Sequence, residues 1–286
     1  MTFLFNHQGI KPLRSIAFEL FNLEVRWYGI LIVFGAILAY AVGLRAAKRL
    51  NVKENDLLDG FVMGLIIGVI GARIWYVIFE WDNFKYDLSS IFFGPWQGLA
   101  IHGGIVAGSI FAFFYCKWKK INPLKIAELL FPGFFIGQIF GRWGNFFNQE
   151  AHGGLVPGAT LDAQRAWLDK FLPDFIVNQM YINGGYYHPT FLYESLWNIV
   201  GLSIIFILRK FVKKYWVGDA MFFYLMWYSI GRFFIEGMRT DSLYVFGLRT
   251  AQLTSIILFA IGAVGFTLRR VYNFYPVSYK EFSEEI

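Results

Sequence analysis

Three arginines interrupt long apolar runs of the chain: Arg73, Arg142 and Arg232. At the centre of a lipid-facing helix an arginine costs roughly 2.5–3.5 kcal/mol, so three of them require partners or a polar ligand. The guanidinium is a rigid fork of donors that matches a phosphate or a carboxylate. The chemistry these residues predict is anion binding, and in a membrane the abundant phosphate is that of a lipid headgroup.

Helical spacing places further polar side chains beside Arg142. Asn145 follows it by three residues, so the two share one helix face. Glu150 closes this polar end of the helix. A carboxylate and an amide next to the arginine indicate a site that can orient a ligand as well as neutralise it.

A second stripe surrounds Arg232. It consists of residues at i, i+4, i+8 and i+11, namely Tyr228, Arg232, Glu236 and Arg239. Glu236 can pair with either arginine of the stripe. One carboxylate among several arginines leaves an excess of positive charge, which favours an anionic ligand.

The elements that position these residues are predicted to be transmembrane helices. The chain of 286 residues is 57% hydrophobic and 16% charged, against about 25% charged in soluble domains. Because a span needs about 20 mostly apolar residues, we predict an all-α integral membrane protein, a bundle of about seven transmembrane helices. The expected spans are 26–45, 60–79, 98–116, 126–147, 190–208, 218–236 and 250–268.

Lysine and arginine cluster in the connections after spans 1, 3 and 5 and in the tail after span 7. The positive-inside rule then puts the N-terminus outside and the C-terminus in the cytoplasm. On this topology five helices carry an ionisable group in the outer half of the bilayer, and a sixth adds a phenol. These residues are Arg73, His102, Arg142, Glu194, Arg232 and Tyr28.

We expect one transmembrane domain over residues 1–286, with an extracytoplasmic insertion at 148–189 that forms a small head or lid.

The start of the chain lacks the pattern of a cleaved signal peptide. The lone Cys116 and four scattered histidines indicate neither a metal site nor a cofactor. The basic residues form no continuous stripe, so a nucleic-acid partner is not expected.

Several motifs in order along the chain resemble the bacterial prolipoprotein diacylglyceryl transferases. The run 141–153, GRWGNFFNQEAHG, matches that family's signature G-R-x-G-N-F-x-N-x-E-x-x-G at each fixed position. Similar matches are Arg26 to Gly29, His102 to Gly104, His188 to Glu194, and Arg232 to Arg239 followed by Gln252. Together they extend over nearly the whole chain.

The resemblance implies an enzyme of lipoprotein maturation in the bacterial cytoplasmic (inner) membrane, multi-pass, with its active site near the outer leaflet. Such an enzyme moves the diacylglyceryl group of phosphatidylglycerol to the thiol of the lipobox cysteine in a preprolipoprotein signal peptide. It forms a thioether and releases glycerol 1-phosphate.

The expected catalytic residues have two tasks. Arg142 and Arg232 stabilise the leaving phosphate, with Arg239 as a third donor. His102 is the natural base for the thiol, and Glu150 or Glu194 are alternatives. The residues expected to bind or orient substrate are Tyr28, Arg73, Asn145, Glu194, Tyr228, Glu236, Arg239 and Gln252, together with Arg142.

Two other readings place polar groups among apolar helices. A non-enzymatic phospholipid transporter or scramblase would more often have its site at the midplane between repeated halves, and no repeat is visible. An intramembrane hydrolase would need a nucleophile or a metal cluster within the chain.

Overall fold

The computed structural model describes residues 9, 11–21, 23–93, 98–239, 244–245 and 248–283. The chain forms two compact units, one of residues 1–42 with 130–286 and one of residues 43–129. We call these the large unit and the small unit and describe each by itself.

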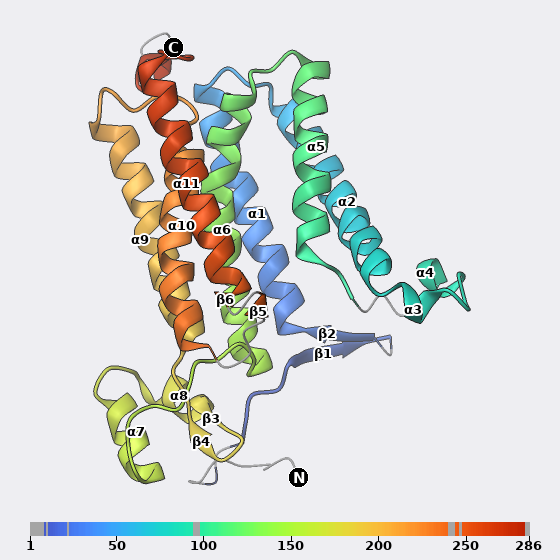
Figure 1. Cartoon of the computed structure of the whole chain (residues 1–286), viewed down its shortest axis with the longest axis vertical. Helices are drawn as coiled ribbons and strands as arrows, with labels where there is room; N and C mark the ends of the chain where they lie inside the picture. Colours follow the sequence, from blue (N-terminus) through green and yellow to red (C-terminus); the bar gives the residue numbers. More distant parts are fainter. Residues whose placement is uncertain are drawn as a thin grey trace. The chain divides into compact units, whose positions relative to one another are not determined.

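Among the residues that the structure describes, seven long helices overlap the seven predicted spans (Figure 1). They are α1 (Trp27–Arg49), α2 (Glu54–Phe79), α5 (Ile101–Lys119), α6 (Pro123–Asn148), α9 (Thr190–Phe211), α10 (Asp219–Met238) and α11 (Thr250–Val271). Within the described residues, five of them, α1, α2, α6, α9 and α11, are long and apolar enough to cross a membrane. Polar residues inside α5 and α10 lower the hydropathy of those two helices. The chain is therefore a predominantly helical, multi-pass membrane protein.

The small unit is built on the contact between α2 and α5. The two helices approach closely where Gly71 meets Gly103, since a Cβ atom on Gly103 would stand 2.3 Å from the Gly71 carbonyl oxygen. Small residues let two helix backbones come this near. Two short helices, α3 (Trp81–Phe84) and α4 (Ser90–Phe93), follow α2.

In the large unit, two tryptophans clamp α9 to α10. The indole Nε1 of Trp197 donates to the carbonyl of Trp227, and that of Trp227 donates to the carbonyl of Trp197, both at 2.9 Å. The rings stack with centroids 4.2 Å apart. Gly231 makes room for the first indole and Gly201 for the second. This clamp fixes the rotation of both helices and hence the direction of their polar faces.

We expect Gly231→Ala to lower the free energy of unfolding by about 1–3 kcal/mol, as overpacking of a filled core does. The new Cβ would lie 2.4 Å from Trp197. Thermal unfolding in detergent measures the effect. Gly43→Ala is the matched control, because nothing lies within 4 Å of the Cβ built there. Equal unfolding temperatures for both variants would contradict the clamp.

Residues 149–189 fold as a small head around a hydrophobic core that is shared with the adjoining ends of α6 and α9. The elements of the head are α7 (Leu161–Asp169), α8 (Asp174–Val177), the 3₁₀ helix η1 (Asn178–Met180), and the paired strands β3 (Tyr181–Ile182) and β4 (Gly185–Tyr186). Thr160 caps α7 by accepting from the backbone of Ala163. Leu168, Val177 and Tyr186 are fully buried in the core, which also includes Phe146 of α6. The head is thus packed onto the end of that helix.

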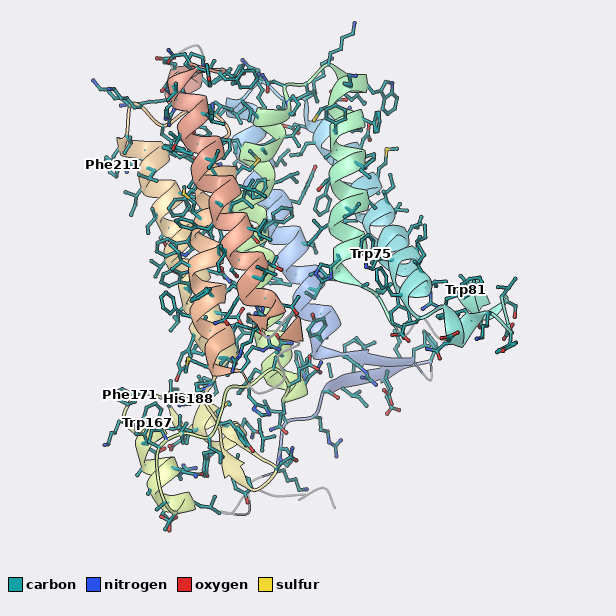
Figure 2. All side chains as sticks on the ribbon, viewed as in Figure 1. Trp75, Trp81, Trp167, Phe171, His188 and Phe211 are labelled. Carbon is teal, nitrogen blue, oxygen red and sulfur yellow. The ribbon has the colours of Figure 1, made fainter. Side chains whose placement is uncertain are left out.

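His188 joins the head to α9. Its ring lies against Trp167 and its Nδ1 is 3.2 Å from the Tyr193 hydroxyl (Figure 2). Burial lowers the pKa of the His188 imidazole below its usual value of 6.5.

Acidification is expected to weaken the head, because the unfolded chain binds the His188 proton at a higher pH than the folded one. The stability that the head has while His188 is neutral is fully present above the ordinary histidine pKa. This stability is partly lost as the pH falls below that pKa. Hydrogen exchange of head amides, corrected for intrinsic rates, should therefore accelerate between about pH 7.5 and pH 5. In His188→Gln this pH dependence should shrink. An unchanged dependence in that variant would assign the effect to another group.

The sequence predicts no element before residue 26, whereas the structure has a β-hairpin there. Strands β1 (Ile16–Leu20) and β2 (Leu23–Arg26) pair antiparallel immediately before α1. Three further elements are described: a short pair of strands before α11, β5 (Tyr244–Val245) and β6 (Leu248–Arg249), and the 3₁₀ helix η2 (Glu281–Ser283) after it.

Candidate active site

The centre of the candidate site is Glu194, a buried carboxylate on α9. One of its oxygens, Oε2, lies 2.6 Å from Nη2 of Arg142 on α6. The other, Oε1, accepts from Nη1 of Arg232 on α10 at 3.4 Å. Glu194 therefore joins two predicted phosphate-binding arginines from different helices.

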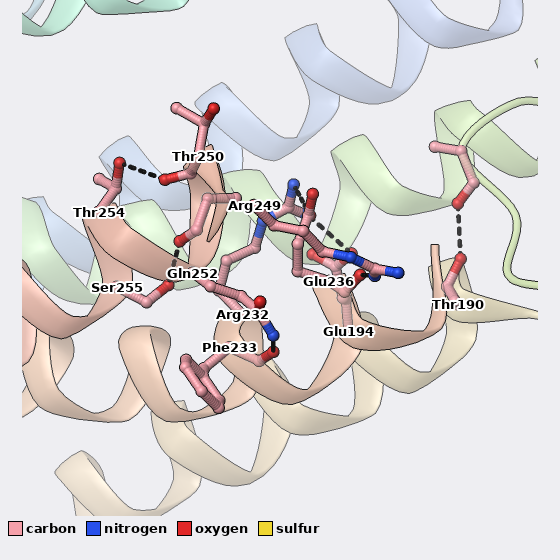
Figure 3. A network of polar contacts seen from close by, with 12 residues as sticks. Thr190, Glu194, Arg232, Phe233, Glu236, Arg249, Thr250, Gln252, Thr254 and Ser255 are labelled. Carbon is pink, nitrogen blue, oxygen red and sulfur yellow. Dashed lines mark hydrogen bonds and ion pairs between the residues drawn. The ribbon is translucent and has the colours of Figure 1, made fainter. Parts of the chain in front are cut away.

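The contacts continue along α10. Nη2 of Arg232 lies 2.6 Å from Oε2 of Glu236, one turn further on. This is the i, i+4 pair that the spacing predicts. Figure 3 shows Glu194, Arg232 and Glu236 converging between the helices.

On α6 the contacts run towards the head. Nη1 of Arg142 donates to the Asn145 side-chain oxygen at 3.3 Å, and the Asn145 amide donates to Glu150 Oε1 at 2.9 Å. Asn148 donates to the same carboxylate oxygen at 3.1 Å. Gln149 and Ala151 have φ of 53° and 57°, so the chain turns sharply on either side of Glu150. The turn directs this carboxylate back to the end of its own helix.

Six predicted residues thus form one continuous chain of polar contacts, which we call the arginine network. Its members are Glu150, Asn145, Arg142, Glu194, Arg232 and Glu236. Because each guanidinium is fixed by at least two contacts, the network is arranged before any ligand binds.

The arginine network carries no excess of positive charge by itself. The two guanidiniums stand against two buried carboxylates, Glu194 and Glu236, with the exposed Glu150 at one end. The predicted excess of positive charge included further arginines, Arg73 and Arg239, and stays a prediction. A guanidinium has five N–H donors, so Arg142 and Arg232 can bind an anion while they retain their carboxylates.

Two tyrosines and a glutamine border the network. The Tyr28 ring of α1 packs against Gly144, where a Cβ would come within 2.4 Å of it. Tyr228 stacks on Tyr224 one turn earlier in α10, with centroids 5.6 Å apart. The Gln252 amide donates to the Phe233 carbonyl at 3.2 Å and so ties α11 to α10. All three predicted positions lie on helices of the large unit.

Arg73 and His102 belong to the small unit. Arg73 donates through Nε, Nη1 and Nη2 to the carbonyls of Ile91, Gly98 and Ser90, at 3.2–3.3 Å. Its guanidinium also lies 5.2 Å from the centroid of the Phe84 ring. These contacts hold the segment after α2, which leads to α5. His102 is exposed in the first turn of α5.

A family model described as prolipoprotein diacylglyceryl transferase matches residues 15–268. The chain belongs to this family. The matched range contains all the predicted site residues, from Tyr28 to Gln252.

Individual family members support the same conclusion. A phosphatidylglycerol–prolipoprotein diacylglyceryl transferase of Staphylococcus saprophyticus is 47% identical over 260 residues, which cover 90% of this chain and 89% of the relative. A protein of the same name from Staphylococcus aureus strain MSSA476 is 45% identical over 276 residues, covering 96% and 94%. One from Staphylococcus carnosus is 42% identical over 267 residues, covering 93% and 94%. The similarity thus extends over nearly the full length of each protein.

One side chain beside the network of this family member was not predicted from sequence. No motif or helical spacing in the sequence points to Arg249, yet its Nη1 donates to the Glu236 carbonyl oxygen (Figure 3). Arg249 directly precedes the first residue of α11, so no helical spacing relates it to α10. The predicted Arg239 directly follows α10 and forms a β-bridge with Gly153 of the head.

We expect Arg73→Lys to loosen residues 80–93. A lysine cannot donate to three carbonyls in the geometry of the guanidinium fork, so the partly buried acceptors at Ser90 and Ile91 lose their bonds to the arginine. Hydrogen exchange should accelerate in that segment, while exchange in the head stays as in the wild type. Protection unchanged at residues 80–93 would contradict the role of these bonds.

Proposed function

We propose that this chain transfers the diacylglyceryl group of phosphatidylglycerol to the thiol of the lipobox cysteine in a preprolipoprotein. The products are a thioether and glycerol 1-phosphate. The names of the relatives support this reaction. The observation that carries the proposal is the pair of arginines from α6 and α10 that Glu194 holds together.

The chemistry follows from where charge develops. The sulfur attacks the glyceryl carbon that bears the phosphate ester, so a C–S bond forms and a C–O bond breaks. Both electrons of the broken bond leave with the phosphate oxygen. Arg142 and Arg232 stabilise that departing charge, and because Glu194 already orients them, little reorganisation is needed. Arg239 is a third donor for the phosphate.

The thiol must lose its proton, since a free cysteine has a pKa of about 8.5 and the thiolate is the nucleophile. We assign this step to His102, with Glu150 as the alternative. Both oxygens of Glu194 already contact guanidiniums. Glu194 is therefore better suited to orienting the arginines than to accepting the proton, and Glu236 has the same task for Arg232.

The remaining residues orient substrate. Tyr28, Asn145, Tyr228 and Gln252 supply hydroxyls and amides for the lipid glycerol and phosphate. Arg73 was predicted to bind substrate directly. Its three bonds to carbonyls favour a supporting role instead, that of holding the segment that leads to α5.

For the whole chain we propose one transmembrane domain of seven helices. The N-terminus lies outside the bacterial cytoplasmic membrane and the C-terminus inside, with residues 148–189 as an extracytoplasmic head and the active site near the outer leaflet. The seven long helices and the basic connections support this topology.

The test is a reconstituted reaction. Purified protein is supplied with phosphatidylglycerol vesicles and a lipobox peptide, and mass spectrometry follows the peptide. We expect a diacylglyceryl adduct on the cysteine peptide and none on the same peptide with serine at that position. Movement of labelled phospholipid between leaflets without any adduct would overturn the proposal in favour of a scramblase.

A further inference from the structure

The hairpin of residues 16–26 has one apolar and one acidic face. In its register Phe18 pairs with Val25, Leu20 with Leu23, and Glu19 with Glu24. Residues opposite each other in an antiparallel pair share a face, and successive residues alternate between faces. Phe18, Leu20, Leu23 and Val25 therefore lie on one face, and the two glutamates lie together on the other.

The apolar face is uncovered. Phe18 and Leu20 are each 52% exposed and Leu23 is 71% exposed. Phe21, at the tip between the strands, is 91% exposed. Contiguous apolar side chains of this size seldom face water, and they mark a surface that binds a partner or a membrane.

The base of the hairpin is held firmly in the large unit. The Trp27 amide donates to the Ser15 carbonyl at 2.9 Å. The Trp27 ring stacks on Phe147 of α6 with centroids 5.1 Å apart. Upstream, the Leu13 amide donates to the Gln179 side chain of the head at 2.8 Å. The direction of the hairpin is thus set by contacts on both sides of its base.

That direction runs across the start of α1. In Figure 1 the two strands extend sideways from the first turn of α1, away from the bundle formed by the large unit. Since α1 is a membrane-spanning helix by length and composition, an element that leaves its end sideways runs along the membrane surface.

We propose that the hairpin is an interfacial anchor whose apolar face lies in the headgroup and acyl-chain boundary of the leaflet at the N-terminal end of α1. Glu19 and Glu24 then face water. Two carboxylates directly opposite each other repel. Water solvates both charges and weakens this repulsion, whereas lipid does not. Direct continuity with a spanning helix favours lipid over a peptide or a second copy of the chain as the occupant.

The test places a fluorescent label on each face. Single cysteines replace Phe21, Leu23, Glu19 or Glu24 in the Cys116→Ala variant. That variant must first have the same thermal unfolding temperature as the wild type. Bimane-labelled proteins are reconstituted in phosphatidylglycerol–phosphatidylethanolamine vesicles that contain nitroxide-labelled lipid. Labels at Phe21 and Leu23 should be quenched several-fold more strongly than those at Glu19 and Glu24. A water-soluble quencher should reverse the order.

Two outcomes would overturn the proposal. Equal quenching of the two faces by lipid nitroxides would mean that the hairpin stands in water. Protection of the apolar face in detergent that grows with protein concentration would assign that face to a second copy of the chain. Neither result depends on diacylglyceryl transfer, so the anchor and the proposed reaction can fail separately.

Discussion

Replacing Arg142 with glutamine is expected to lower kcat for adduct formation by about 10²–10³-fold, the usual loss when one preorganised donor to a developing anion is removed. The side chain stays polar but is shorter than that of arginine. What disappears is the charge and the fork that contact Glu194 and Asn145. Because the arginine acts most strongly on charge that forms in the transition state, KM should change much less than kcat.

Two companion variants make this result interpretable. Arg142→Lys keeps the charge without the planar fork, so its kcat should fall between those of the wild type and the glutamine variant. Arg26→Gln is the matched control, since Arg26 pairs with Glu24 at the surface with its side chain 60% exposed, and it should react as the wild type does. A raised KM with unchanged kcat for Arg142→Gln would mean that this arginine only binds the lipid.

Glu194→Gln should damage both stability and catalysis. The change leaves two guanidiniums without their shared carboxylate, and breaking a buried ion pair on one side costs about 3–5 kcal/mol. We expect a value near the lower end, about 3 kcal/mol, because Arg142 and Arg232 retain 20% and 15% exposure of their side chains. The kcat should fall as well, since both arginines lose the group that orients them. Thermal unfolding in detergent and the adduct assay measure the two effects.

Glu236→Gln is the control for this variant. Glu236 is buried as deeply as Glu194 but forms an ion pair with Arg232 alone among the described residues. Its replacement should therefore destabilise the protein less and leave Arg142 oriented. A larger loss of activity in Glu236→Gln than in Glu194→Gln would show that Glu194 is not the centre of the network.

Contacts between residues close together in the sequence were predictable. The pairing of Arg232 with Glu236 follows from i, i+4 spacing, and the cluster of Arg142, Asn145 and Glu150 follows from one short run. The positions of the seven long helices follow from apolar runs of about 20 residues. In each case the relevant geometry is set by one helix.

Contacts between distant elements were not predictable in the same way. That Glu194 joins α6 and α10 depends on how three helices are rotated, which the Trp197–Trp227 clamp helps to fix. The bond from Arg249 to the Glu236 carbonyl depends on the path of the chain between α10 and α11.

The hairpin was not predicted because its own sequence carries weak strand and turn signals. Its strands have only five and four residues, and the turn between them carries Phe21 at φ 48°, where glycine or asparagine is the usual signal. The alternation of apolar and acidic residues in 18–20 and 23–25 is the one sign of it in the sequence.

The most direct test of the reaction is isotopic. Wild-type protein is supplied with phosphatidylglycerol and a lipobox peptide in water enriched in ¹⁸O, and mass spectrometry quantifies both products. Attack by the thiol on carbon predicts equal amounts of diacylglyceryl peptide and unlabelled glycerol phosphate, because the phosphate keeps the oxygen of the broken C–O bond. Glycerol phosphate that carries ¹⁸O, or that forms without an equal amount of adduct, would indicate hydrolysis by water and contradict the account.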